Sequence, residues 1–593
     1  MSRDRLSSRR SAMRPLTPLL LRAAVTARRQ LRTSEAWFIL LALLIGVMAG
    51  LAAVALGALA HAMQALLFGL PPFERLSAQA AIAPWRLLAL PLGGALLGGM
   101  IWIARRRTPI DVVEANTLHG GRIPGRDTFM VAGQTVVSNG TGASVGLEAA
   151  YAQVGGGLAS LVGQRLKLRR NDLRTLVGAG AGAALGAAFG APLAGAFYAF
   201  EIVLGAYTPA TIAPVAAAAL AAALTARSLG APPYLIAASS SQTVGTADYL
   251  LYAGLGLVCA GVGIAIMRLI ADIEGMVRRL PVPDYARPLL GGLCLMPIAF
   301  LSPQALSAGH GALDLNLTGD IALGVLATVF LLKVAASSVS LGFGFRGGLF
   351  FASLFLGALL GRIYAGALAM VPDLHPLIPS DAALVGMAAL AVAIVGGPMT
   401  MALLVLEVTH DFALTGTVIT ASLVTSAIVR ERFGYSFSTW RMHLRGETVR
   451  SGRDIGWVRS LTAGAMMRRD VPTVRADTGI ARFRDLYPLG AATRVVLVEP
   501  DGAYAGIVRT ADAYAGAADA AAPVASLATL RDATLSPEMN IATIMAVFDS
   551  HEADDLAVVG PGGKALGILT EKYARRRYSE ELEKAQRALY GED

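Results

Sequence analysis

The sequence is short of charge and of the residues that metal and redox chemistry need. Only 16% of its 593 residues are charged, and its two cysteines, Cys259 and Cys294, both fall in apolar segments. Neither a disulfide framework nor a zinc site is therefore expected. No His-Glu-x-x-His motif occurs, and the carboxylates within apolar segments are scattered singly, which argues against an embedded metalloprotease and against a divalent-cation path. We expect neither an enzyme nor a resident metal.

What the chain does have is apolar length and glycine. It is 55% hydrophobic with 65 glycines, which indicates that the bilayer is its solvent. Several apolar segments are too long for one span, too short for two, and interrupted by Gly and Pro, a pattern typical of transporters that place helix ends inside the membrane. The sequence predicts a mainly α polytopic membrane protein of broken, tilted helices. The apolar segments are 36–69, 86–104, 128–164, 173–205, 207–228, 247–270, 284–302, 321–341, 347–370 and 381–430.

Positive charge is concentrated beside these segments. Residues 1–35 hold nine arginines against Asp4 and Glu35, so the positive-inside rule places this end in the cytoplasm. The apolar stretch that follows is too long for the core of a signal peptide. The net charge of +10 does not indicate nucleic-acid binding, because the arginines flank membrane segments. We expect an integral protein of the plasma (inner) membrane with both termini cytoplasmic and the lipid bilayer as its main partner.

The membrane part repeats itself. The stretch from Gly190 to Glu201 can be laid on that from Gly396 to Glu407 with Pro and Glu in register, and the Gly-x-Gly-x-x-x-Gly-Leu pattern ending at Leu147 recurs at Leu349. Small-residue patterns recur by chance in glycine-rich membrane proteins, but two pairs in the same order make chance a poor explanation. Two inverted repeats, with a substrate held between them, are the expected architecture.

Glu148 follows a glycine-rich turn at the start of a helix predicted from about Leu147 to Leu161. A helix start exposes backbone N–H groups and the positive end of the helix dipole, which attract an anion without a full charge. An intramembrane carboxylate is costly and usually functional. Glu148 is therefore predicted to occupy the anion position as a gate; the alternative is a first-turn residue that merely stabilises the dipole. Leu349 and Phe350 begin the matching helix.

These motifs together resemble the CLC family of chloride channels and chloride/proton antiporters. The resemblance covers about residues 36–445 and rests on Val405-Leu-Glu-Val-Thr409 after Gly397-Pro398, on Phe189-Gly-Ala-Pro192 and on Gly347-Gly-Leu-Phe350. It implies a homodimer that carries chloride or a similar anion. It also implies the anion-binding residues, which are Gly121, Ile123, Gly146, Leu147, Glu148, Ala149, Leu349, Phe350 and Phe437, with Tyr435 as a substitute.

The departures from the family pattern bear on mechanism. Gly121 stands where the family has a serine, Phe437 where it has a tyrosine, and Ile202 where it has the glutamate of the inner proton route. Backbone amides would then supply most of the anion coordination. Passive anion conduction gated by Glu148 is therefore the first hypothesis, chloride (or other halide)/proton antiport by an atypical proton route the second, and transport of another ion a remote third.

Other ionisable residues receive more modest interpretations. Glu201 and Glu407 are predicted to make structural hydrogen bonds to backbone rather than to transfer protons. Lys333 and Arg346 flank the second helix start and could raise the local positive potential, although Arg346 could equally be a boundary anchor. His119 and His410 show no ligand spacing and are expected to be solvated or capping residues.

Beyond residue 450 the sequence resembles a tandem CBS pair, a small α/β module. Strands are predicted at Thr493–Val498 and Leu556–Val559, each followed by a Gly-hydrophobic-hydrophobic pattern. The first pattern keeps Asp512 but has Arg509, and the second keeps Thr570 but has Tyr573. A structural role is therefore preferred over binding of an adenine nucleotide, which remains the alternative; no other cofactor is expected. The predicted domains are 1–35 (basic segment), 36–445 (anion transport), 446–459 (linker), 460–515 and 516–580 (CBS-like modules) and 581–593 (charged tail).

Overall fold

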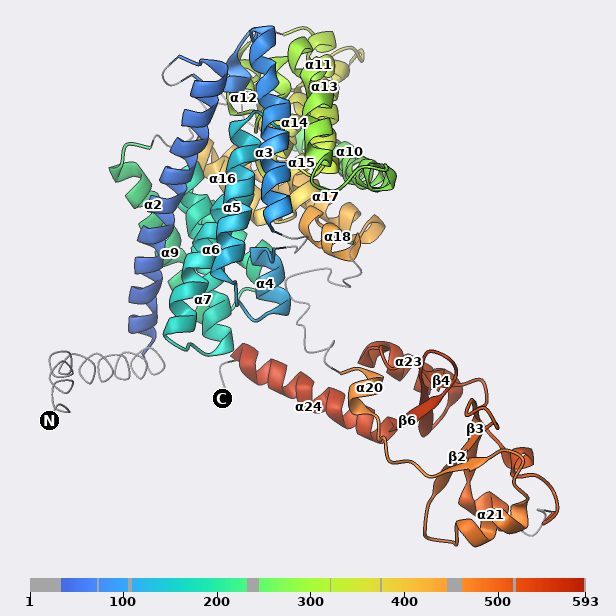
Figure 1. The fold of residues 1–593 in the computed structure, drawn as a ribbon. Coiled ribbons are helices and arrows are strands. Elements are labelled where there is room, and N and C mark those ends of the chain that lie inside the picture. The colour runs from blue at the N-terminus through green and yellow to red at the C-terminus, as the bar shows by residue number, and fades with distance from the viewer. Residues whose placement is uncertain are drawn as a thin grey trace, which may run out of the picture. The chain divides into compact units, whose positions relative to one another are not determined.

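The computed structural model describes residues 34–71, 74–104, 109–231, 245–319, 321–373, 376–444, 461–515 and 519–590. The chain divides into two compact units, 1–454 and 455–593. The predicted basic segment 1–35 falls almost entirely, and the predicted linker 446–459 entirely, outside the described residues. Each unit is considered by itself below (Figure 1).

The first unit is a bundle of helices, several of which are short and interrupted (Figure 1). Seven helical segments among the described residues are long and apolar enough to cross a membrane, as the composition predicts. The helices of its first half are α2 (Glu35–Phe68), α3 (Ala89–Ile103), α4 (Val112–Leu118), α5 (Gly125–Gly140), α6 (Glu148–Arg165), α7 (Arg170–Phe189), α8 (Pro192–Tyr198) and α9 (Pro209–Ser228). Those of the second half are α10 (Thr246–Arg279), α11 (Arg287–Leu301), α12 (His310–Thr318), α13 (Leu323–Gly342), α14 (Phe350–Leu368), α15 (Pro379–Val395), α16 (Pro398–Thr409), α17 (Phe412–Arg432) and α18 (Phe437–Leu444).

Small residues let these helices approach closely. Gly155 of α6 and Gly180 of α7 face each other so tightly that a Cβ on either would lie within 2.4 Å of the carbonyl oxygen of the other. Gly357 of α14 and Gly386 of α15 form the same kind of contact. In a membrane, where lipid competes for apolar surface, such close backbone contact is a main source of helix association. The abundance of glycine therefore reflects helix packing as well as the broken turns.

The two halves of this unit repeat one arrangement, which confirms the predicted architecture of broken helices in inverted repeats. Helices α5 and α6 are joined by the turn that contains Gly146, and α13 and α14 by the turn that contains Gly348. These two turns run antiparallel and pair with each other. The chain therefore brings two interrupted helix starts together in the interior of the bundle.

The second unit contains two three-stranded sheets of the same topology. The first has the order β1 (Thr473–Arg475), β2 (Arg494–Val498) and β3 (Tyr504–Arg509), and the second β4 (Thr534–Leu535), β5 (Asp555–Val559) and β6 (Ala565–Thr570). In each sheet the first pair of strands is parallel and the second antiparallel. The predicted strands 493–498 and 556–559 are thus confirmed to within one residue, as is a small α/β fold after the membrane part.

The two sheets of the tail exchange segments. Helices α21 (Ile480–Leu486) and α22 (Thr510–Ala513) belong with the first sheet, and α23 (Ile541–His551) and α24 (Glu571–Tyr590) with the second. The short helix α20 (Ala463–Met466), which precedes the first sheet, packs into the core of the second. Val496 and Ile507 of the first sheet pack on Ala557 and Ile568 of the second. The two modules of the tail therefore share packed surfaces and form one unit.

Candidate functional site

A cavity of about 420 Å³ lies in the membrane unit, and Glu148 is among the residues that line it. Its lining includes the segment before α4, the first turns of α6 and α14, and α18, which are far apart in the sequence; residues of α3, α5 and α10 also contribute. Arg346 and Arg441 lie on its wall together with Asp111 and Glu274. A cavity inside a membrane protein is the place where irregular backbone is tolerated.

The starts of α6 and α14 meet in the wall of this cavity. The Gly146 amide donates to the Gly348 carbonyl at 2.9 Å, and the Gly348 amide donates to the Gly146 carbonyl at 3.1 Å. Leu147 and Leu349, one residue further on in each chain segment, are the N-caps of the two helices, and neither helix has a side-chain cap. Two positive helix ends are thereby held side by side. We predicted these two starts as partners, and the structure brings them together.

Glu148 places its carboxylate between these two helix starts. The side chain is buried, and Oε1 accepts a hydrogen bond of 3.0 Å from the amide of Phe351 in α14. Among the described residues, Oε2 has no hydrogen-bond partner. A Cβ on Gly146 would come within 1.9 Å of this atom and one on Gly348 within 2.8 Å. The two glycines therefore leave a space that Oε2 of Glu148 fills.

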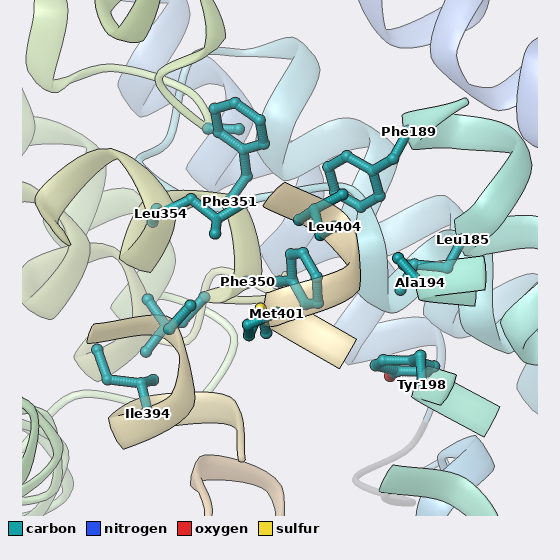
Figure 2. Close-up of a cluster of buried hydrophobic side chains, with 14 of the residues drawn as sticks. Leu185, Phe189, Ala194, Tyr198, Phe350, Phe351, Leu354, Ile394, Met401 and Leu404 are labelled. Carbon is teal, nitrogen blue, oxygen red and sulfur yellow. The ribbon is translucent and has the colours of Figure 1, made fainter. Parts of the chain in front are cut away.

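Aromatic side chains pack against Phe350, the first residue of α14. The rings of Phe189 and Phe350 are 5.1 Å apart, and Tyr198 meets Phe350 edge-on at 6.2 Å. Figure 2 shows Phe350 with residues of α7, α8 and α16 around it, including Leu185, Ala194 and Met401. Close packing of this kind fixes the orientation of a helix end, so the amides of the first turn of α14 are held in one direction.

Of the two residues predicted at the end of the membrane domain, Phe437 lines the cavity and Tyr435 does not. Phe437 begins α18 and lines the cavity, and the guanidinium of Arg441 lies 5.8 Å from the centre of its ring. Tyr435 instead stacks on His443 and meets Trp440 at a tilt, and its hydroxyl is 3.3 Å from Nδ1 of His443. The structure therefore brings Phe437 to the cavity with Ala149, Leu349 and Phe350, but not Tyr435. An apolar ring stands where the family resemblance implies a hydroxyl.

Gly121 and Ile123 are also not brought to the cavity, which corrects the sequence assignment. They lie in the turn between α4 and α5, where Ser160 of α6 donates to the Gly121 carbonyl at 2.7 Å and accepts from the Ile123 amide at 2.8 Å. Of the described residues, those that line the cavity in this region are Pro109 and Asp111–Val113. The assignment rested on the local Gly-Arg-Ile-Pro pattern. That pattern lies in the turn after α4, whereas the segment that lines the cavity lies before α4.

The sequence before α4 contains a helix-start pattern from which this part of the cavity lining could have been predicted. Asp111 is the N-cap of α4, and its Oδ1 accepts a hydrogen bond of 2.8 Å from the amide of Glu114. An Asp followed three residues later by Glu is a helix-start pattern in sequence. Pro109 just before it also favours an extended segment that leads into a helix start. The start of α4 is thus a third helix end at the cavity.

Glu201 and Glu407 make the structural hydrogen bonds that we predicted, each with the other repeat. The carboxylate of Glu201 accepts from the amides of Met399 (3.2 Å) and Thr400 (2.8 Å) and from the Thr400 hydroxyl (2.7 Å) at the start of α16. The carboxylate of Glu407 accepts from the amides of Leu193 (2.8 Å) and Ala194 (2.9 Å) at the start of α8. Ile202, next to Glu201, lies against the backbone of Gly396 and Gly397 instead.

We expect Glu201→Gln to destabilise the membrane unit by about 2 kcal/mol, because hydrogen bonds to a charged group contribute about 1.5–3 kcal/mol. The neutral amide would also turn one N–H donor toward the donors of α16. Thermal unfolding of the purified chain in detergent measures the effect. The control is Glu431→Gln, which changes an exposed carboxylate at the end of α17. Equal melting temperatures of the two variants would contradict the capping role.

In the tail, both residues considered for nucleotide binding already have partners within the module. Asp512 accepts from Nε of Arg509 at 3.0 Å, and Thr570 Oγ1 accepts from the Tyr573 amide at 3.3 Å. Tyr504 donates to the Leu530 carbonyl at 2.8 Å, and burial raises the pKa of its phenol. The contacts of Asp512 and Thr570 are local, each between residues three apart in the chain, whereas the Tyr504 contact joins β3 to the segment before β4.

The broken helices, the paired helix starts and the buried carboxylate together define a membrane protein of the transporter class. The family model for voltage gated chloride channels matches residues 93–430. A ClcB-like chloride channel protein of Ralstonia nicotianae is 32% identical over 381 residues, which cover 62% of this chain and 88% of the relative. The voltage-gated ClC-type chloride channel ClcB of Salmonella typhimurium is 28% identical over 407 residues, or 66% and 95% of the two chains. The chain belongs to the voltage gated chloride channel family, which confirms the predicted CLC resemblance.

Solved structures have the same fold. A slow cyanobacterial Cl⁻/H⁺ antiporter matches with a TM-score of 0.59 and 21% identity, over 69% of this chain and 97% of that one. A CLC-type fluoride/proton antiporter matches with a TM-score of 0.57 and 22% identity, over 66% and 95%. A eukaryotic CLC transporter matches with a TM-score of 0.58 and 18% identity, over 92% of this chain and 98% of that one. At these identities the likeness concerns the fold.

Proposed function

We propose that this protein carries small inorganic anions, chloride first among them, across a membrane, with Glu148 as the gate. The relatives are named as chloride channels, and anion transport is the function that the family and the site have in common. The anion position is the space at Gly146, Leu147, Glu148, Ala149, Leu349 and Phe350, with Phe437 on the cavity side. Gly121, Ile123 and Tyr435 are not part of this proposal, because the cavity lining does not include them.

The observation that carries the proposal is the place of the Glu148 carboxylate. It lies between two helix starts, accepts one backbone amide, and leaves Oε2 without a hydrogen bond among the described residues. A buried acceptor without a partner is costly. A reversible block of an anion path requires a group that fits the anion position but can leave it. The Glu148 carboxylate meets both conditions, because its space suits a negative charge and its burial without a partner for Oε2 costs free energy. Weak coordination by amides also lets an anion leave again.

The setting of this function follows from the sequence. We propose that both termini are cytoplasmic in the plasma (inner) membrane, on the basis of the arginines near the N-terminus. From the family resemblance alone we propose that two copies associate, each with its own anion path. The tail is then a cytoplasmic CBS-like pair, at 460–515 and 516–580, whose role is regulatory or structural. Its Arg509–Asp512 contact favours the structural role over nucleotide binding.

Exchange of anion for protons is the second candidate, favoured by the buried Glu148 carboxylate in the lining of the cavity, since this group could take up a proton there. The cyanobacterial and fluoride-transporting structures with this fold are both antiporters. Against it stands Ile202, which cannot relay a proton and occupies the position that the resemblance gives to an inner glutamate. Conduction is therefore placed first.

A flux experiment tests the proposal and separates the two candidates. Vesicles that contain the purified chain and a chloride gradient are expected to release chloride once a potassium ionophore removes the opposing voltage. Protein-free vesicles are the control. If the chloride gradient drives protons against the proton gradient, the protein exchanges anions for protons and the conduction proposal is rejected. If neither chloride, bromide nor nitrate leaves the vesicles faster than from the control, anion transport is rejected.

A further inference from the structure

A group of exposed arginines lies at one end of the membrane unit, where the chain turns between α4 and α5 and between α6 and α7 (Figure 1). Residues 120–126 and 164–174 hold seven basic side chains against one acidic side chain, that of Asp172. We call four exposed members of this group the arginine surface: Arg122, Arg126, Arg169 and Arg170. Within the described part of the chain, none of these four guanidinium groups has an ion pair or a hydrogen bond.

The two turns that carry the arginine surface pack against each other. Gln164, in the last turn of α6, donates to the Ile123 carbonyl at 3.4 Å. A Cβ on Gly120 would come within 2.7 Å of Nε of Arg170, so the Arg170 side chain lies against the turn that contains Arg122. The arginines of both turns therefore belong to one surface, which protein contacts hold together without any ligand.

The charges of this surface are crowded. Arg169 is the N-cap of α7 and Arg170 its first residue, and the positive end of a helix repels cations. The guanidinium groups also repel each other. Bound anions relieve both kinds of repulsion. A guanidinium group donates two parallel hydrogen bonds to phosphate oxygens, which makes phosphate a well-matched anion for such a surface.

Exposed apolar side chains lie one helical turn further into the unit. On α5, Phe129 is 82% exposed and follows Arg126 by three residues, so both lie on one face of the helix. On α6, Leu161 is 40% exposed and precedes Arg165 by four residues. A cation at a helix end with an apolar side chain one turn deeper is the order expected where a helix passes from lipid headgroups into acyl chains.

We propose that the arginine surface binds the phosphate groups of anionic phospholipids in the leaflet at this end of the unit, which is also the end where α2 begins (Figure 1). The occupant is a lipid rather than a soluble acidic partner, because Phe129 and Leu161 offer acyl chains a contact beside the charges. None of the four arginines lines the cavity, so this binding is separate from the proposed anion path.

The test uses the full chain purified in a neutral detergent and follows its melting temperature as phospholipid is added in mixed micelles. Saturating phosphatidylglycerol is expected to raise the melting temperature by about 3 °C more than phosphatidylcholine, which has no net charge, because a ligand of the folded state stabilises it. Sodium chloride at about 0.5 M should remove most of this difference, since salt screens exposed charges. Equal shifts with the two lipids, or a difference that salt does not reduce, would overturn the proposal.

Substitution of all four residues of the arginine surface by glutamine should abolish the difference between the two lipids. The matched control removes the same number of positive charges from exposed positions of the tail and should keep the full difference. Its changes are Arg468→Gln, Arg469→Gln, Arg482→Gln and Lys572→Gln. If the two variants lose the difference equally, net charge rather than this surface attracts the lipid, and the proposal fails.

Two double variants keep the test decisive where four changes together prevent folding. These are Arg122→Gln with Arg126→Gln, and Arg169→Gln with Arg170→Gln. Each should lose a large part of the difference between the two lipids, because each basic residue near an anionic lipid surface adds to the attraction. A full difference in both double variants would overturn the proposal.

Other sources of negative charge are separated in the same assay. Inorganic phosphate presents phosphate oxygens without acyl chains, and polyglutamate presents the charge of a soluble acidic polypeptide. Both should shift the melting temperature of the unmodified chain by less than phosphatidylglycerol does at an equal concentration of charge. An equal or larger shift with inorganic phosphate or with polyglutamate would assign the arginine surface to that class of ligand and reject the lipid.

Discussion

The Glu148→Ala variant is expected to bind bromide about tenfold more tightly than the unmodified chain, and to move no protons against their gradient. The reason is that the carboxylate of Glu148 is itself an anion tethered at the site. A group on so short a tether competes at an effective concentration in roughly the millimolar range. Calorimetric titration with bromide measures the affinity, and the vesicle assay measures the proton movement.

The control for this variant is Glu431→Ala, which removes an exposed carboxylate from α17 and should leave bromide affinity unchanged. A crystal of the Glu148→Ala chain soaked in bromide should show density near the amides of Leu147 and Leu349. Unchanged affinity together with empty density there would mean that Glu148 does not stand in the anion position. The carboxylate would then be a structural group of the first turn of α6.

Gly146→Ala in the Glu148→Ala background should weaken bromide binding by about tenfold or more. The added methyl group would stand 1.9 Å from the place where Oε2 of Glu148 lies, so it would fill the space that an anion needs. Overfilling a close-packed site costs about 1–3 kcal/mol, and 1.4 kcal/mol corresponds to about tenfold in affinity. The same calorimetric titration measures the effect.

A matched glycine is available as the control. Gly99 in α3 has open space where a Cβ would be placed, so Gly99→Ala should not change bromide affinity. A Gly146→Ala chain that binds bromide as well as the Gly99→Ala chain would place the anion elsewhere. In the unmodified background, Gly146→Ala should also displace the carboxylate, because the end of a flexible side chain can move without disturbing the backbone.

Both predictions depend on one part of the proposal, which is that the gate and the anion occupy the same place. A full positive charge at that place would hold either one too firmly. Amides at helix ends are weaker ligands and permit exchange. The apolar ring of Phe437 on the cavity side contributes no hydroxyl. Backbone amides at the two helix starts are therefore the groups that we propose attract the anion.

The sequence by itself determined the local features of this protein. Gly and Pro at set spacings indicate where helices are interrupted, because only certain backbone conformations can interrupt them. From these spacings came the start of α6 at Glu148, the start of α14 at Phe350 and the equivalence of Glu201 with Glu407. The strands of the tail followed in the same way from alternation of apolar and polar residues.

Only the tertiary structure decided which of these local features meet. Glu148 and Phe351 are 203 residues apart in the chain, and Glu201 caps a helix of the opposite repeat. The position of Gly121 was wrong because a short motif describes a turn but not the place to which the turn is carried. Hydrogen bonds between distant segments depend on how whole helices pack, and packing is a property of all the residues at once.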